Sequence, residues 1–182
     1  MEFLLRVSRG IDRFSVAVGR AAAWLILASI LISAANATSR KLFDVASNAS
    51  LELQWYLFGA AFLLAAAWTL QRGEHIRIDI ASAALPERVR DWIDLAGHVL
   101  MLLPFTILMI VETTPFVLDS FRLQETSTSY GGLIVWPAKA LILVSFLMLF
   151  VQGLSEIIKR IAVMRGLVED PRRQGGEAPA HR

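Results

Sequence analysis

The residues best suited to chemistry lie together in one short segment. Arg72, Glu74, His75, Arg77 and Asp79 follow a long apolar stretch and alternate with isoleucines. His75 and Asp79 are four residues apart, so on a helix they would share one face. A zinc site needs three or four ligands, and no second histidine is near in the sequence. The segment therefore supplies half a metal site at most, and it suits a charged turn at a membrane surface better.

The residue types in the chain give little support for other kinds of catalytic site. The chain has no cysteine, which excludes thiolate chemistry and cysteine-ligated metals. No serine or threonine lies in a nucleophile motif, and no glycine-rich phosphate loop occurs. A haem carried by a helix bundle would need paired histidines, and only His98 is suitably placed. We therefore predict no catalytic residue, no metal and no cofactor.

The elements that position these residues are long apolar runs. Hydrophobic residues make up 55% of the 182 residues, whereas ordinary soluble domains contain about 45–50%. The excess is concentrated in runs close to the ~20 residues that cross a bilayer. The sequence predicts an all-α integral membrane protein with one domain over residues 1–168. Its four transmembrane helices are expected at about 15–38, 51–71, 95–118 and 132–158.

Shorter features surround these spans. Residues 1–14 have an amphipathic pattern that predicts a helix lying on the inner leaflet, and residues 86–94 predict a second interfacial helix that starts at Leu85-Pro86. Prolines inside the third span, at positions 104 and 115, are expected to kink it. A turn is predicted at Gly131-Gly132, and a disordered cytoplasmic tail at 169–182.

The distribution of basic residues predicts the orientation. Fourteen of the eighteen lysines and arginines lie in the two terminal segments and the middle connection. By the positive-inside rule, these three segments and both termini are cytoplasmic, where they would contact anionic lipid heads. Nucleic-acid binding is disfavoured because no soluble basic domain is present. The Ala35-Asn36-Ala37 sequence is typical of a signal-peptide cleavage site. However, the twenty preceding residues with four arginines favour an uncleaved first span.

Two ionisable residues lie within the predicted spans. Such groups are costly in a membrane and tend to be paired or functional. Glu112 and Lys139 would both lie ~10 Å below the outer surface, at ~1.5 Å per helical residue. We hypothesise that they pair and lock the third helix to the fourth. Alternatively, Lys139 extends outward and Glu112 meets solvent or a partner subunit.

Several motifs resemble the small permease subunit of TRAP transporters, the Q-type or DctQ-like family. Glu52 opens the second span, which ends in Arg72-Gly73-Glu74-His75-Ile76-Arg77-Ile78-Asp79, and Leu85-Pro86 follows. The stretch GGLIVWPAKALILVSFLMLFVQGLSEIIK resembles the fourth-helix region of the longer family members. The resemblance covers roughly residues 15–160. It implies that the residues of these motifs have structural or interface roles, and we expect His75, Arg77 and Asp79 to fix the turn by local hydrogen bonds.

The resemblance also implies partners and a location. A large M-type subunit would carry the substrate and sodium sites and move as an elevator. A soluble periplasmic binding protein, the P-type component, would deliver an organic acid. The small subunit would scaffold the large one in the bacterial inner membrane without binding substrate itself. Two alternatives remain open, namely a membrane-anchor subunit of a redox enzyme and a stand-alone small transporter.

Overall fold

The computed structural model of the chain describes residues 1–45, 47–72 and 86–168. Its regular structure there is helical, apart from an isolated antiparallel bridge between Thr126 and Ile134. The helices are α1 (Glu2–Phe43), α2 (Asn48–Arg72), α4 (Glu87–Gly97), the π-helical turn η1 (His98–Leu102), α5 (Leu103–Arg122) and α6 (Trp136–Met164). Four helical segments are long and apolar enough to cross a membrane. The predicted all-α fold with four spans is therefore confirmed.

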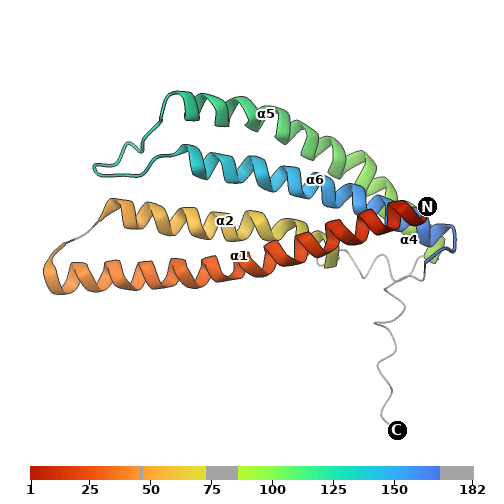
Figure 1. Ribbon diagram of the computed structural model, residues 1–182, viewed down its shortest axis with the longest axis horizontal. Helices are drawn as coiled ribbons and strands as arrows, with labels where there is room; N and C mark the ends of the chain where they lie inside the picture. Colours follow the sequence, from red (N-terminus) through yellow and green to blue (C-terminus); the bar gives the residue numbers. More distant parts are fainter. Residues whose placement is uncertain (46, 73–85, 169–182) are drawn as a thin grey trace, which may run out of the picture.

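The four long helices run side by side and reverse direction at each connection (Figure 1). Helix α6 is central, because it packs against α1, α2 and α5. The α1–α2 and α5–α6 connections lie at one end of the bundle, and the N-terminus lies at the other end with the end of α6 (Figure 1). This arrangement places the start and the end of the described chain on the same side.

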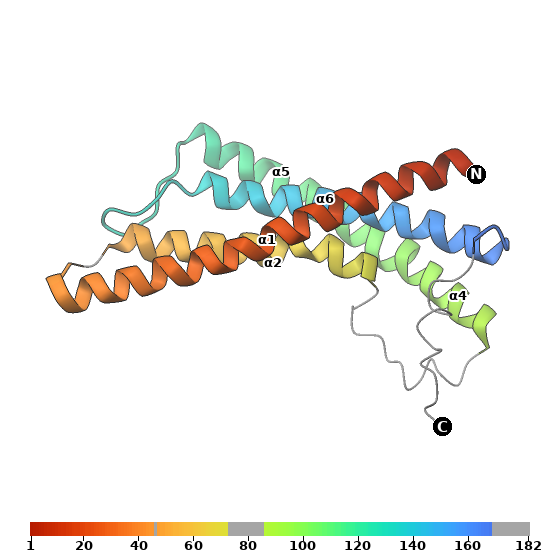
Figure 2. The same cartoon turned by 60° about the horizontal axis from the view of Figure 1, so that its bottom comes forward.

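Helix α1 is one continuous helix, whereas the sequence led us to predict a surface segment at 1–14 and a separate span from residue 15. It crosses the bundle obliquely, so that its later half lies along α2 and its earlier half against α6 (Figure 2). Residues 2–14 therefore do not form a separate segment, and Ser8 and Ser15 face α6 and are buried there. The location of this part of α1 at the inner leaflet stays a prediction. No proline interrupts the helix.

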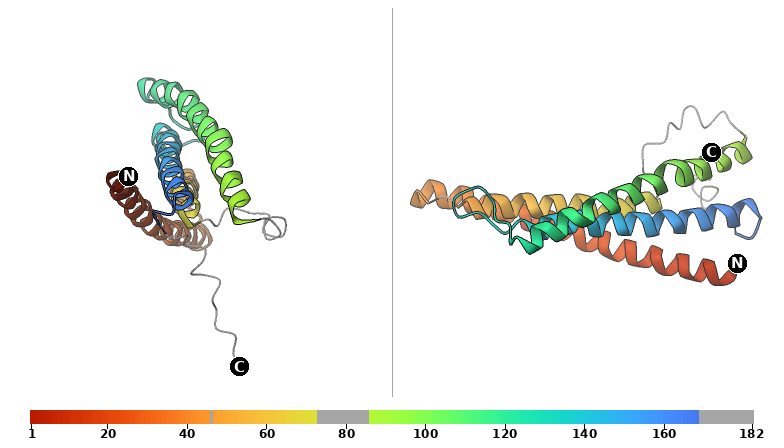
Figure 3. Two further views of the ribbon diagram at one scale, coloured as in Figure 1. Left: turned by 90° about the vertical axis from the view of Figure 1, so that its right-hand side faces the viewer. Right: turned by 90° about the horizontal axis from the view of Figure 1, so that it is seen from above.

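Helices α4 and α5 also form one continuous segment, Arg88–Arg122, through the turn η1. Pro86 caps α4 as the sequence predicts, and α4 continues into α5 without a break instead of forming a separate helix. Its location at the membrane interface stays a prediction. Pro104 has no N–H to donate, and the π-helical turn directly precedes it, with Leu103 N–H bonded to the His98 carbonyl. The Thr106 hydroxyl approaches the carbonyls of residues 102 and 103 at 2.9 and 3.0 Å. The helix curves along this stretch, as Figure 3 shows.

The packed interior consists mainly of small and hydroxylated residues, together with Gln152. Among the described residues the buried hydrophobic side chains are all alanines, including Ala60, Ala61 and Ala67 on α2. Large apolar side chains lie on the outside, such as Trp24 at 71% exposure and Phe62 at 75%. Small residues let membrane helices approach closely, and lipid can cover large apolar side chains. This distribution is the one expected for a bundle surrounded by lipid.

The closest helix contact that we can test involves Gly19 of α1. A Cβ at this position would lie 2.6–2.9 Å from Trp68 of α2, whereas a Cβ at Gly10 would meet nothing within 4 Å. We expect Gly19→Ala to lower the free energy of unfolding by about 1–3 kcal/mol, as overpacking does. Gly10→Ala should be neutral or stabilising by up to ~1 kcal/mol, through helix propensity. Thermal unfolding of the two variants in detergent measures the difference, and equal melting temperatures would refute the close contact.

Candidate functional site

The family-like motif at the end of α2 is only partly described. Arg72 is the last residue of α2, and its guanidinium carbon lies 4.6 Å from the centroid of the Trp68 ring. This cation–π contact joins Arg72 to the side chain that packs on Gly19. A structural role for Arg72 fits this position. Gly73, His75, Arg77 and Asp79 lie outside the described residues, so the turn expected there stays a prediction.

Glu52 near the start of α2 holds the connection between α5 and α6. Its carboxylate accepts a hydrogen bond from the Ser127 hydroxyl and a second one, of 2.7 Å, from the Leu133 N–H. Asn48, one turn earlier, donates to the Tyr130 carbonyl at 3.0 Å. Hydrogen bonds to charged acceptors are stronger than neutral ones. Glu52 therefore attaches residues 123–135, here called the outer hairpin, to a helix far away in the sequence.

The outer hairpin has backbone hydrogen bonds of its own. Ser127 N–H donates to the Leu133 carbonyl, and Val135 N–H to the Glu125 carbonyl, both at 2.9 Å. The turn predicted at Gly131-Gly132 is confirmed, with Gly131 at a φ of 70° that favours glycine. A Cβ at Gly132 would lie 2.9 Å from both Glu52 carboxylate oxygens. The second glycine therefore allows the hairpin to reach Glu52.

Lys139 on α6 pairs with Glu125 of the outer hairpin and not with Glu112. Its Nζ lies 2.5 Å from a Glu125 carboxylate oxygen and 3.9 Å from the Phe116 ring centroid. Its side chain is only 13% exposed. The hypothesis of a Glu112–Lys139 pair was wrong because the hairpin brings a closer carboxylate over the first turn of α6. In the alternative, Lys139 extends outward, which agrees with this pair, and Glu112 is exposed. Its contact with solvent or a partner subunit stays a prediction.

The Glu125–Lys139 pair predicts a response to acid. The hydrogen bond from Lys139 lowers the pKa of the Glu125 carboxyl below its usual 4.5. A lowered pKa means that the pair stabilises the folded chain at neutral pH and that this contribution is lost as the pH falls through the lowered pKa. Hydrogen exchange in the outer hairpin should therefore accelerate as the pH falls below about 4.5, after correction for the intrinsic rate. Protonation of Glu52, which also holds the hairpin, contributes to the same response. Lys139→Met should therefore reduce the acceleration without abolishing it, and an unchanged pH response in that variant would contradict the role of the pair.

A second polar cluster lies at the opposite end of the bundle, between α1 and α6. The Asp12 carboxylate accepts hydrogen bonds from Lys159 at 3.0 Å, Gln152 at 2.8 Å and Ser155 at 3.2 Å. Ser8 lies 2.6 Å from Ser155. We call these residues, with Ser15 and Glu156, the inner cluster. Each hydrogen-bonded group depends on the others, so the cluster fixes how α1 docks on α6.

The inner cluster was not among the predicted sites. It joins Ser8, Asp12 and Ser15, spaced four and three residues apart, to a similar polar stripe on α6 that begins at Gln152. The Ser15 hydroxyl donates to the Gln152 side-chain oxygen at 2.7 Å, and Gln152 is fully buried. Two polar stripes at helical spacing at the same membrane level are the signal that could have revealed the contact.

A further ion pair joins α4 to α6. Arg160 contacts Asp91 and Asp94, each at 3.2 Å, and all three side chains are at least four-fifths buried. His98 donates from Nδ1 to the Asp94 carbonyl at 2.6 Å. The described part of the chain thus has polar contacts between helices at both ends, and at one end a helix also contacts the outer hairpin. Within that part, no three histidine or carboxylate side chains are grouped so as to hold a metal ion. This arrangement can hold helices in place.

Comparison with known proteins adds one match. A family model described as tripartite ATP-independent periplasmic transporters, DctQ component, matches residues 29–163. The matched range begins within α1 and contains all of α2, α4, α5 and nearly all of α6. No curated protein and no solved structure matches the chain.

Proposed function

Because the chain belongs to the DctQ-component family of tripartite ATP-independent periplasmic (TRAP) transporters, we propose that it scaffolds the large permease subunit of such a transporter. The large subunit would be the sodium-coupled one and would move an organic acid that a periplasmic binding protein delivers. The family is a component of transporters and not a family of enzymes. The chain is accordingly a small, multi-pass membrane subunit, and we place it in the inner membrane.

The match over residues 29–163 carries the proposal, and the polar contacts support the scaffolding role. A scaffold must keep its shape while its partner moves, and charged or hydrogen-bonded contacts fix both ends of this bundle. Transporter substrate sites usually lie near the bilayer midplane, where discontinuous helices expose their ends. The described residues contain one π-helical turn but no helix broken in the middle of the bundle. These features favour a supporting subunit.

Reconstituted uptake tests the proposal. Proteoliposomes that contain this chain alone should show no uptake of organic acid down a sodium gradient. Liposomes with the large subunit, this chain and the binding protein should accumulate the substrate, and omission of this chain should abolish or greatly reduce uptake. Uptake by this chain alone would favour the stand-alone transporter and refute the proposal. Full uptake without this chain would refute the scaffolding role.

We also propose that both termini are cytoplasmic, as the basic residues predict. Arg9, Arg13 and Arg20 line a shallow groove of about 430 Å³ beside Gln71 at the same end of the bundle as the inner cluster. This position suits contact with anionic lipid heads. The outer hairpin, with Tyr130 97% exposed at its tip, would then face the periplasm and the binding protein.

Cysteine labelling tests the orientation, and the absence of native cysteine makes the test clean. Tyr130 and Leu167 are exposed at opposite ends of the bundle, at 97% and 55%. A membrane-impermeant maleimide should label the Tyr130→Cys variant in intact spheroplasts. It should label the Leu167→Cys variant only after lysis. The reverse pattern would invert the proposed topology.

A further inference from the structure

Glu112 is a carboxylate in the outer part of a spanning helix. It lies nine residues after the start of α5 and ten before its end, which is ~15 Å from the outer end at ~1.5 Å per residue. Its side chain is exposed. Among the described residues, none forms a hydrogen bond or ion pair with it. A charged group facing lipid at this depth is costly, and such groups normally find a partner.

Glu112 lies beside the packed side of α5 and not within it. Thr106, Thr113 and Ser120 are spaced seven residues apart and are buried against the rest of the bundle. Glu112 directly precedes Thr113, which places it about 100° around the helix from that buried stripe. It belongs to a set of exposed residues that continues from there around the side of the helix away from the bundle. We call this set the Glu112 face, and it comprises Met101, Leu108, Val111, Glu112, Pro115 and Asp119.

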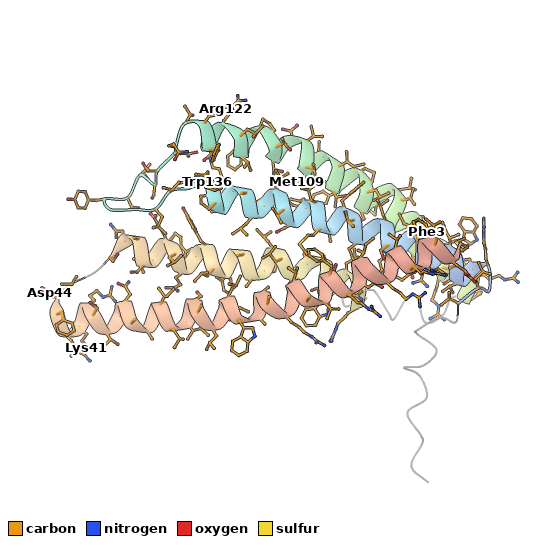
Figure 4. The ribbon with its side chains drawn as sticks, in the orientation of Figure 1. Phe3, Lys41, Asp44, Met109, Arg122 and Trp136 are labelled. Atoms are coloured by element: carbon orange, nitrogen blue, oxygen red, sulfur yellow. The ribbon has the colours of Figure 1, made fainter. Side chains whose placement is uncertain are left out.

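The helix that carries the Glu112 face is the least covered of the four spans. Only 6% of the residues in its most apolar stretch are buried, against 17–22% in the corresponding stretches of the other three spans. Helix α5 packs on α6 and lies at the outer edge of the bundle, where Figure 4 shows side chains directed away from the other helices. This helix therefore has the most surface left for another membrane protein.

The charges on the Glu112 face limit what can cover it. Glu112 and Asp119 are seven residues apart, and the one basic residue of α5 is Arg122 at its end, three residues after Asp119 and ten after Glu112. A second copy of this chain docked through the same face would bring like charges together in a medium of low dielectric constant. Lipid tails would leave the carboxylate without a partner. A different protein with a basic or hydrogen-bond-donating side chain would match the face.

We infer that the Glu112 face is the surface that docks the large permease subunit, and that this subunit presents a lysine, arginine or other donor side chain to Glu112. The inference rests on the proposed function, because that function supplies the membrane partner. Leu108 and Val111, at 57% and 59% exposure, would provide apolar contact around the carboxylate. The rest of the outer surface, including Trp24 on α1 and Phe62 on α2, would face lipid.

Site-specific photo-crosslinking in the assembled transporter tests this surface. A photoreactive phenylalanine analogue replaces Leu108 or Val111 in one set of variants, and Trp24 or Phe62 in the control set. The controls are at least as exposed as the test positions, at 71% and 75%. We expect adducts with the large subunit at positions 108 and 111 and not at the controls. Adducts between two copies of this chain, adducts with lipid only, or large-subunit adducts at the control positions would overturn the inference.

Substitutions of Glu112 test the carboxylate itself. Glu112→Lys should lower the amount of large subunit that co-purifies with this chain by roughly tenfold or more, because a desolvated charge contact is lost. Glu112→Gln keeps an acceptor oxygen and should retain most of the recovery. Unchanged recovery with Glu112→Lys would overturn the role of the carboxylate. If Glu112→Lys fails to insert, the crosslinking variants still decide the surface, because they keep Glu112.

The two proposals fail in different ways. If the large subunit co-purifies with the unmodified chain but the crosslinks come from another face, only this inference is wrong. If the large subunit does not co-purify with the unmodified chain at all, both the proposed function and this inference are wrong.

Discussion

Asp12→Ala is expected to lower the free energy of unfolding by about 2–4 kcal/mol. The substitution removes the acceptor shared by Lys159, Gln152 and Ser155. Gln152 is fully buried, and Lys159 is only 29% exposed, so water compensates little for the lost contacts. Glu156 remains within 2.6 Å of Lys159, which limits the loss. Thermal or denaturant unfolding in detergent micelles measures the effect.

Matched variants distinguish the loss of the inner-cluster contacts from the general effect of removing a carboxylate from α1. Glu2→Ala removes another carboxylate of α1, but Glu2 is 94% exposed and lies 4.0 Å from Arg6, so its loss should be close to neutral. Asp12→Asn keeps an acceptor oxygen at the same position and should cost less than Asp12→Ala. If Asp12→Ala and Glu2→Ala have the same small effect, the inner cluster does not hold α1 to α6.

Glu52→Ala should detach the outer hairpin from α2 while the four spans remain folded. It removes the acceptor of the Ser127 and Leu133 hydrogen bonds, and bonds to charged acceptors are stronger than neutral ones. Hydrogen exchange at the backbone N–H groups of residues 125–135 should therefore accelerate measurably. Exchange within α5 and α6 should change little. Mass spectrometry of peptic fragments measures both regions.

The matched control for Glu52 is Asn48→Ala. Asn48 also bonds the hairpin, but its contact with the Tyr130 carbonyl is exposed to solvent. Its loss should accelerate exchange far less than the loss of Glu52. Equal protection of the hairpin in Glu52→Ala and the unmodified chain would show that Glu52 does not hold it.

The spans were predictable from sequence because lipid imposes a length and a composition on them. The runs that predict helices at 51–71 and 132–158 correspond to α2 (Asn48–Arg72) and α6 (Trp136–Met164). The first helix was predicted too short, since α1 covers Glu2–Phe43. Phe3, Leu4 and Val7 indicate an apolar face for lipid, and they are indeed exposed. However, the same pattern does not show that the opposite, polar face packs on another helix.

The ionisable residues were harder to assign. Counting residues from the ends of the predicted spans placed Glu112 and Lys139 at the same depth in the membrane. However, the partner of Lys139 depends on how the outer hairpin folds. That fold requires Gly132 to approach Glu52, which is a contact between residues eighty positions apart. Glu52 itself was selected through the family resemblance, and its hydrogen bonds with the hairpin give that selection a physical basis. The residue pattern within a single helix does not predict such contacts between distant segments.

Co-purification with the large permease subunit is the most direct measurement of the proposed function. The two chains are co-expressed with an affinity tag on this one alone, solubilised in a mild detergent and analysed by size exclusion. We expect both chains to elute together, and Glu112→Lys to reduce the share of the large subunit. Elution of this chain alone, with the large subunit folded and present in the same extract, would contradict its assignment as a scaffolding subunit.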